Sequence, residues 1–241
     1  MLNFTCTSFS HWSNDWQSTS TSLLSKEELS RLHQMLSTRR KTQFLAGRLL
    51  VRVFIAEHFA CEPEKVNLAA VAPTFASCGG AHLANISISH SADYLAVAIG
   101  KDMLGIDYEL EYPSRDWLAI AQSCFHDEEV SWLQKQPKSV LAQEFLRIWT
   151  TKEALSKCSG EDLGKLLTTI PIINDVNSWP KRLAEFHCWR GAIGRGAYLA
   201  LVGNGAPTPP PFHLNGTYRT NFNDSRGSKV RLYRIAASQL S

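Results

Sequence analysis

The chain lacks most of the features that mark specialised classes of protein. Its six cysteines are scattered without a C-x-x-C pair, which fits reduced thiols better than a disulfide framework or a zinc finger. The amino terminus shows no basic segment followed by an apolar stretch, so we expect no secretory signal. The longest apolar region, FLAGRLLVRVFIA, is interrupted by Arg48 and Arg52, which argues against a membrane span. These absences predict a cytoplasmic protein that does not enter the membrane.

A strong net charge is also missing. The formal charge of +3 is too small to indicate binding to nucleic acid or to a membrane surface. The hydrophobic share of 44% and the charged share of 20% are those of an ordinary soluble globular protein. At 241 residues the chain can hold one large domain or two small ones. Local basic clusters therefore carry more information than the total charge.

What is present is a mixed pattern of helices and strands, so we expect an α/β fold. The capping box formed by Ser25 and Glu28 starts one predicted helix. Hydrophobic periodicity predicts further helices over 38–60, 114–125, 126–136 and 139–158, and strands over 2–9, 85–100 (a hairpin turning at SHSAD), 105–110, 184–190 and 196–203. A helix-plus-sheet unit thus occurs about twice, without a sequence repeat that would prove a duplication.

The end of the chain differs in composition from the rest. GAPTPPP, from residue 205, predicts a stiff extended linker, and a polar, basic tail follows to residue 241. Within that tail KVRLYRIAA is either an edge strand or part of a disordered segment. The tail carries no identifiable chemistry.

Carboxylates give the first indication of function. Asp107 and Glu109 lie two residues apart in GIDYELE, so on a strand they project to one face while Ile106 and Tyr108 pack on the other. Glu153, in RIWTTKEALSK, adds a third carboxylate from a helix. Such a set suits a hard divalent cation such as Mg²⁺, whose remaining ligands are water and substrate phosphate. Taken alone, a D-x-E pattern is more often a solvated strand face.

Basic residues give the second indication. Lys157 follows Glu153 at the i,i+4 spacing, which also fits a simple surface ion pair. Arg40 and Arg48 lie on the predicted helix over 38–60, and arginine binds phosphate through a planar bidentate fork. A solvated helix face is the alternative for Arg40, whereas Arg48 interrupts an apolar run and needs either a partner or a cleft.

The segment SHS contributes a histidine at the predicted hairpin turn. His90, flanked by Ser89 and Ser91, could hold an anion through hydrogen bonds from its ring and the two hydroxyls. The alternative is a structural histidine satisfied by a neighbouring carbonyl group.

Read together, five segments resemble the Sfp-type (group II) 4′-phosphopantetheinyl transferases. They are FLAGR (44–48), ISISHS (86–91), GIDYE (105–109), FHDEE (125–129) and WTTKEALSK (149–157). The combination of G-I-D-x-E with W-x-x-K-E-A-x-x-K is highly specific. The resemblance covers about residues 40 to 160, in the order and with the spacing of the family.

The resemblance implies a fold and a division of the chain. We expect a pseudo-dimer of two similar α/β halves, each a small sheet packed with helices, over residues 1–104 and 105–204, with the linker and tail over 205–241. The active site is expected in the cleft between the halves. Because one chain can form the whole cleft, we expect a monomer.

The resemblance also implies the reaction. The phosphopantetheine arm of coenzyme A, the co-substrate, would move to a serine of an apo acyl carrier protein or peptidyl carrier domain, releasing 3′,5′-ADP. A non-catalytic relative that binds coenzyme A or a carrier protein is the alternative, and a Mg²⁺-dependent phosphohydrolase is a third hypothesis. The carrier, and hence the pathway, is left open by the sequence. Trp117 and Leu118 are candidates for docking a carrier helix, although both could simply be core.

Residue roles follow from the resemblance position by position. Asp107, Glu109 and Glu153 match the ligands of Mg²⁺, and Lys157 the lysine that approaches the pyrophosphate. Residues matching contacts to the phosphates of coenzyme A are Arg40, Arg48, Ser89 and His90, and Glu129 matches a glutamate of less settled role. The base is either Glu153 or a metal-bound water. The family's G-K-P element before S-H-S is missing, which leaves one phosphate contact unassigned.

Overall fold

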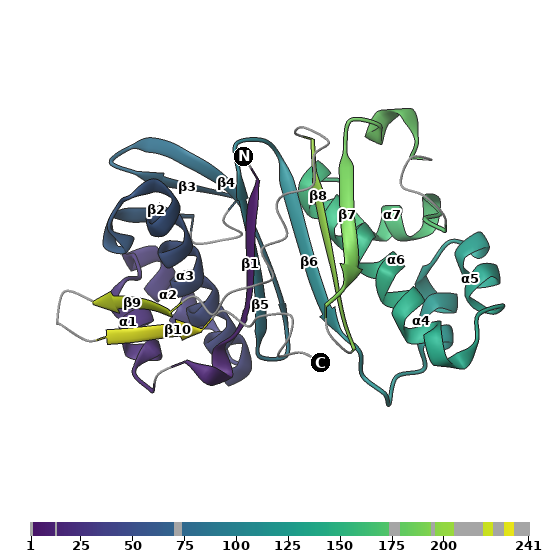
Figure 1. The fold of residues 1–241 in the computed structure, drawn as a ribbon, viewed down its shortest axis with the longest axis horizontal. Helices are drawn as coiled ribbons and strands as arrows, with labels where there is room; N and C mark the ends of the chain where they lie inside the picture. Colours follow the sequence, from purple (N-terminus) through teal and green to yellow (C-terminus); the bar gives the residue numbers. More distant parts are fainter. Residues whose placement is uncertain are drawn as a thin grey trace. The chain divides into compact units, whose positions relative to one another are not determined.

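The computed structural model describes residues 2–12, 14–69, 74–173, 179–193 and 196–204, and the backbone of 219–223 and 229–233. It divides into two compact units, residues 1–101 with 213–236 and residues 102–212 with 237–241. In Figure 1 each unit combines helices with antiparallel strands, which confirms the predicted mixed α/β fold. We call them unit 1 and unit 2.

Unit 1 contains a five-stranded antiparallel sheet in the order β1-β5-β4-β3-β2. Its strands are β1 (Asn3–Ser8), β2 (Val66–Leu68), β3 (Phe75–Cys78), β4 (Ala81–Ser91) and β5 (Tyr94–Gly100). Its helices are α1 (Trp16–Ser22), α2 (Lys26–Gln34) and α3 (Thr38–Phe59), with 3-10 turns η1 (Phe9–His11) and η2 (Pro63–Lys65). The first strand, the second and third helices and the β4–β5 hairpin confirm the sequence predictions.

Capping and burial explain the two predicted helices of unit 1. The Ser25 hydroxyl accepts from the Glu28 N–H while the Glu28 carboxylate accepts from the Ser25 N–H, which is the expected capping box. Helix α3 is buried continuously from Leu45 to Ile55, so it lies inside the unit and not along its surface. Arg48 and Arg52 are only 4% and 2% exposed, so the basic side predicted for this helix does not face solvent at these two residues. This agrees with the expectation that Arg48 needs a partner or a cleft.

Unit 2 contains a three-stranded antiparallel sheet in the order β6-β8-β7. Its elements are β6 (Leu104–Leu110), α4 (Trp117–Cys124), α5 (Asp127–Leu133), α6 (Lys138–Ser159), α7 (Leu163–Thr169), η4 (Lys181–Leu183), β7 (His187–Ala192) and β8 (Ala197–Gly203). Helix α6 packs along β6 and β8. Trp117 belongs to the core with Phe145 and Ile148, which supports its reading as a core residue.

The short elements α1, β2, β3, α7 and β9 were not predicted from the sequence. The sequence of α1, WQSTSTS, shows no apolar period. Hydroxyl groups help to hold this helix instead, since the Ser20 Oγ donates to the Leu45 carbonyl oxygen at 2.7 Å. Strands β2 and β3 have three and four residues, too few to show an alternation.

The predicted linker over 205–211 lies outside the described residues. In the tail, β10 (Lys229–Tyr233) lies within KVRLYRIAA, but it pairs with β9 (Arg219–Asn223) in a separate two-stranded sheet. The strand alternative for this segment is therefore confirmed, and the partner of the strand is β9.

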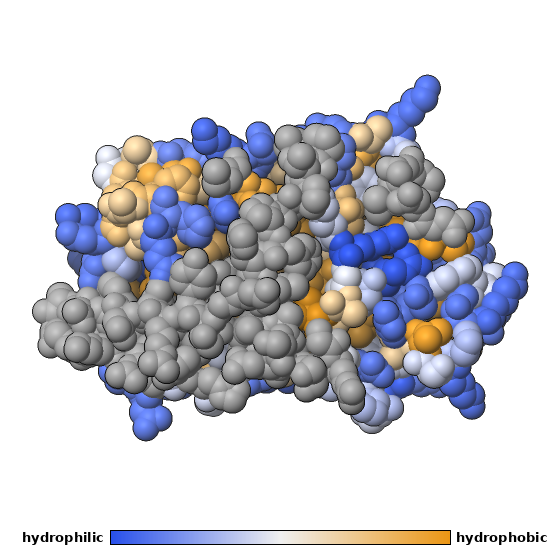
Figure 2. Space-filling model, in the orientation of Figure 1, coloured by the Kyte–Doolittle hydropathy of each residue, from blue (hydrophilic) through white to orange (hydrophobic). Residues whose placement is uncertain are grey.

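Along the described chain, no helix combines the length and the hydropathy needed to cross a membrane. On the face shown in Figure 2, hydrophilic residues surround separate hydrophobic patches. The large hydrophobic side chains most exposed among the described residues are Leu36, Phe59, Phe75 and Met103.

Candidate active site

Strand β6 directs its acidic residues toward helix α6. Gly105 lies so close to this helix that a Cβ atom there would be 2.0 Å from the Ala154 carbonyl oxygen. Because side chains alternate along a strand, Asp107 and Glu109 project to the same face as Gly105. Asp107 is 2% exposed and Glu109 is half-buried. The glycine thus permits the close packing that brings α6 next to the Asp107 carboxylate.

Helix α6 supplies the partners of Asp107. The Lys157 Nζ donates to Asp107 Oδ1 at 2.7 Å and to the Ile106 carbonyl oxygen at 3.1 Å. The same Nζ is 3.9 Å from Glu153 Oε2. Lys157 and Glu153 are 30% and 25% exposed, so solvent reaches this group of charges. One ammonium group therefore faces carboxylates from both β6 and α6.

The electrostatic setting of Glu153 reflects this arrangement. Burial raises the pKa of Glu153, the nearby Asp107 charge raises it further, and Lys157 acts in the opposite direction. Two carboxylates close enough to affect each other are stabilised by a cation, and here Lys157 supplies it. The pair thus favours any positive charge brought to the site.

Oxygen donors of this kind fit a hard divalent cation such as Mg²⁺. Among the described residues, however, no three His, Cys, Asp or Glu side chains are gathered closely enough to hold a metal ion. In this structure Asp107 and Glu153 are bridged by Lys157, and Glu109 lies two residues along the same face of β6. The donor chemistry therefore fits the predicted metal, while the three carboxylates do not form a ready-made cage.

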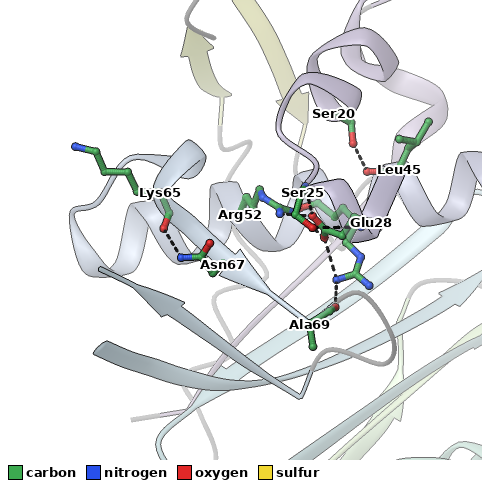
Figure 3. A network of polar contacts seen from close by, with 9 residues as sticks. Ser20, Ser25, Glu28, Leu45, Arg52, Lys65, Asn67 and Ala69 are labelled. Carbon is green, nitrogen blue, oxygen red and sulfur yellow. Dashed lines mark hydrogen bonds and ion pairs between the residues drawn. The ribbon is translucent and has the colours of Figure 1, made fainter. Parts of the chain in front are cut away.

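In unit 1 the structure places Arg48 in an ion-pair cluster with Glu28 and Arg52. Figure 3 shows Glu28 and Arg52 of this cluster, with Ala69 nearby. Its Nη1 is 3.2 Å from Glu28 Oε1 and donates to the Ala69 carbonyl oxygen at 2.7 Å. The Arg52 guanidinium contacts the same carboxylate at 2.6 Å. Burial lowers the pKa of Arg48 to about 10, against the opposing effect of Glu28. The Arg48 guanidinium has found a buried partner, and its contact to a phosphate stays a prediction.

The other predicted phosphate contacts lie at separate places in unit 1. Arg40 is exposed in the first turn of α3, where its N–H donates to the Ser37 Oγ. His90 is exposed on β4, whereas Ser89 and Ser91 are each 5% exposed. Alternation along β4 directs the two serines to the face opposite His90. The structure therefore does not bring the histidine and both hydroxyls together on one face, as an anion site at this turn would require.

Two features of unit 2 were not recognised from the sequence. The close approach at Gly105 could have been inferred from a glycine inside an otherwise apolar strand. Glu129, matched to a glutamate of unsettled role, forms a fully buried ion pair with Lys152 at 2.5 Å. A lysine in the middle of an amphipathic helix is usually solvated, so nothing in the sequence marked Lys152 as buried.

Comparison with known proteins places these residues in a family. The model of the 4′-phosphopantetheinyl transferase superfamily matches residues 103–200, which include Asp107, Glu109, Glu153 and Lys157. The 4′-phosphopantetheinyl transferase AcpT of Salmonella typhimurium is 32% identical over 177 residues, covering 73% of this chain and 80% of AcpT. The chain belongs to the 4′-phosphopantetheinyl transferase superfamily. This confirms the resemblance read from the five sequence segments.

Other members of the superfamily are similar over shorter stretches. The 4′-phosphopantetheinyl transferase HetI of Nostoc is 29% identical over 59% of this chain and 62% of HetI. The 4′-phosphopantetheinyl transferase ffp of Bacillus subtilis is 27% identical over 62% of this chain and 71% of ffp. As a 4′-phosphopantetheinyl transferase family member, the protein is an enzyme of the transferase class.

Proposed function

We propose that this enzyme transfers the 4′-phosphopantetheine arm of coenzyme A to a serine of an apo carrier protein, releasing 3′,5′-ADP. The observation that carries the proposal is the meeting of Asp107, Glu153 and Lys157 where α6 packs on β6. These residues lie in the region matched by the family model. A non-catalytic binding module is less favoured, because binding alone does not require this set of charges beside one another.

The reaction is the attack of an alcohol oxygen on phosphorus within a diphosphate, so positioning and charge neutralisation dominate the barrier. Mg²⁺ bound by Asp107, Glu109 and Glu153 would neutralise negative charge on the diphosphate. Lys157, partly exposed beside Asp107, would donate to the phosphate oxygen that leaves with 3′,5′-ADP. Glu153 would accept the serine proton, directly or through a water molecule.

The raised pKa of Glu153 supports its part in proton transfer. A carboxylate whose pKa lies above the usual range is a stronger base than a solvated glutamate. At 25% exposure it is also accessible to an incoming hydroxyl group. Contact with a metal would lower this basicity, so the two proposed roles of Glu153 oppose each other.

Binding of coenzyme A is proposed to use residues of unit 1 as well. Arg40 and His90 are exposed and can donate hydrogen bonds to phosphate oxygens, whereas Ser89 and Arg48 are buried. For Arg48, contact with a phosphate would compete with its ion pair to Glu28. We therefore rank Arg40 and His90 above Ser89 and Arg48 as phosphate contacts.

The partner and setting complete the proposal. A sequence pI of about 8.5 suits an acidic carrier protein, either an acyl carrier protein or a peptidyl carrier domain. Salt screens attraction between exposed charges, so charge reversal at Arg40 should weaken carrier modification more at low salt than at high salt.

We also propose that the enzyme acts as a monomer in the cytoplasm.

The test is intact mass spectrometry of a panel of apo carrier proteins incubated with the enzyme, coenzyme A and Mg²⁺. The proposal predicts that one phosphopantetheine arm is added to at least one carrier and that a chelator prevents it. Binding of coenzyme A without modification of any carrier would favour the binding module. Hydrolysis of coenzyme A without an acceptor would favour a phosphohydrolase.

A further inference from the structure

A buried ion pair lies next to the candidate active site on helix α6. Lys152 and Glu129 are both 0% exposed, and the Lys152 Nζ donates to Glu129 Oε2 at 2.5 Å. The same Nζ donates to the Leu167 carbonyl oxygen at 2.8 Å. Burial lowers the pKa of Lys152, and Glu129 opposes the shift. The residue that follows Lys152 in the chain is Glu153.

Glu129 extends this network beyond the pair. Its Oε1 accepts from the Ile172 N–H at 2.7 Å, and its Oε2 accepts from the His126 N–H at 3.3 Å. Through Lys152 the network reaches the carbonyl of Leu167 in α7. One buried carboxylate therefore joins the start of α5, the middle of α6 and the segment after α7.

The pair holds α6 on the side away from the sheet. Two residues apart on a helix, Lys152 and Ala154 lie roughly 200° from each other around the axis. Ala154 is the residue whose carbonyl meets the backbone of β6 at Gly105. Helix α6 is thus fixed on two nearly opposite sides, by Gly105 and by Glu129, one residue either way from Glu153.

Stability alone is a poor explanation for such a pair. Desolvation of two charges is costly, and well-packed apolar residues of similar volume are often as stable as a buried ion pair. Apolar contacts are not directional, so they would not fix the rotation of α6 about its axis as hydrogen bonds to particular oxygen atoms do. This rotation matters because even a small change in it would carry Glu153 and Lys157 away from Asp107.

We propose that Glu129 and Lys152 are positioning residues for the transfer reaction. Neither touches the reacting atoms; together they fix the rotation of α6 so that Glu153 and Lys157 face Asp107. This inference rests on the proposed function for its kinetic consequences, while its structural consequence is independent of that function.

The test replaces the pair by apolar residues of similar volume, Glu129→Leu with Lys152→Met. We expect a melting temperature below that of the wild type, because the N–H groups of Ile172 and His126 and the Leu167 carbonyl lose their partners, although no charge is left buried without one. The value of kcat is therefore measured per folded molecule. We expect kcat to fall by about tenfold to a hundredfold, since a misplacement of about 1 Å has effects of this size. The KM for coenzyme A should change far less than kcat.

The matched control removes an exposed ion pair from the same unit, Glu161→Gln with Arg182→Gln, whose side chains are 23% and 47% exposed. It should leave melting temperature, kcat and KM close to those of the wild type. If the apolar variant does not fold, Glu129→Gln with Lys152→Met keeps a side-chain oxygen that can accept from the Ile172 N–H and leaves no buried charge, and the same reduction of kcat with little change in KM is expected.

A crystal structure of the apolar variant decides the structural consequence without reference to activity. We expect Lys157 Nζ and Asp107 Oδ1 to lie further apart than the 2.7 Å of the wild type. An unchanged distance together with wild-type kcat would overturn the proposal and leave the pair as a structural one. If the wild type modifies no carrier, the proposed function fails, but the distance in the variant still decides whether the pair positions α6.

Discussion

Each unit contains a cluster of charged side chains, and the two clusters differ in their burial and in their balance of cations and carboxylates. In unit 1, Arg48 and Arg52 both contact the single carboxylate of Glu28, and all three side chains are at most 4% exposed. In unit 2, the single ammonium of Lys157 faces Asp107 and Glu153 and is 30% exposed. Cations exceed carboxylates in the first cluster, whereas carboxylates exceed cations in the second.

This difference indicates different roles for the two clusters. A buried carboxylate held by two guanidinium groups is fixed, and it also caps α2 through the Ser25 N–H. A partly exposed pair of carboxylates with one lysine is able to exchange its partners with a metal ion or a phosphate. We therefore infer a structural role for the Glu28 cluster and propose a catalytic one for the Asp107 cluster.

The largest effect is expected from Asp107→Asn, which keeps the shape of the side chain and removes its charge. Loss of this charge should reduce transfer by roughly a hundredfold to a thousandfold, the range seen when one stabilising group is removed from an active site. Intact mass spectrometry of the carrier over time measures it. Transfer at the wild-type rate would contradict the assignment of catalysis to this cluster.

Glu28→Gln should have the opposite profile. It leaves the buried Arg48 and Arg52 without their carboxylate, and breaking a buried pair in this way costs about 3–5 kcal/mol of folding stability. Urea unfolding monitored by tryptophan fluorescence measures the loss. A variant as stable as the wild type would show that the cluster is not what holds α2 to α3.

Gly105→Ala should affect both properties at once. Its Cβ would meet the Ala154 carbonyl oxygen at 2.0 Å, so α6 must shift relative to β6. We expect a loss of about 1–3 kcal/mol in stability from overpacking, and a decrease in kcat of about tenfold or more from displacement of Glu153.

Gly191→Ala is the matched control for this substitution. Gly191 lies on β7 of the same sheet, and a Cβ there would have nothing within 4 Å. It should keep both kcat and stability close to those of the wild type. Equal effects of the two substitutions would mean that the contact at Gly105 does not set the position of α6.

The smallest of the expected effects is a change in metal affinity caused by Lys157→Met. Because Lys157 is the cation that contacts Asp107 in this structure, its removal should strengthen the binding of Mn²⁺, a probe for Mg²⁺, by several-fold. Electron paramagnetic resonance titration of the protein alone measures this affinity. Transfer should decrease in the same variant, since the proposed donor to the leaving phosphate is lost.

If Mn²⁺ binds Lys157→Met as it binds the wild type, Lys157 does not compete with the metal. Weaker binding would instead indicate that the lysine holds the carboxylates in place for the metal. Either result would require a different account of the Asp107 cluster.

Local pattern predicted most of the fold. The capping box at Ser25 and Glu28 gave the start of α2 correctly, and the apolar period gave α6 with its buried Phe145, Ile148 and Leu155. Short elements such as β2 were missed because three residues carry too little periodicity.

For the site, the sequence predicted the acidic residues of β6 and α6 but could not assign the charges in buried segments. Arg48 interrupts an apolar run, whereas Lys152 lies between Thr151 and Glu153 and carries no such signal. Their partners, Glu28 and Glu129, lie 20 and 23 residues away in the chain. Only the tertiary structure shows that both lysine and arginine are buried against a carboxylate. The predicted location of the active site in a cleft between two halves stays a prediction.

The most direct test of the contrast between the clusters compares Asp107→Asn and Glu28→Gln in one experiment. For each variant, the rate of carrier modification per folded molecule is measured together with the free energy of unfolding. Our account predicts that Asp107→Asn loses transfer while remaining folded, and that Glu28→Gln loses stability while its folded molecules still modify the carrier. The reverse pattern, or loss of transfer in Glu28→Gln alone, would contradict it.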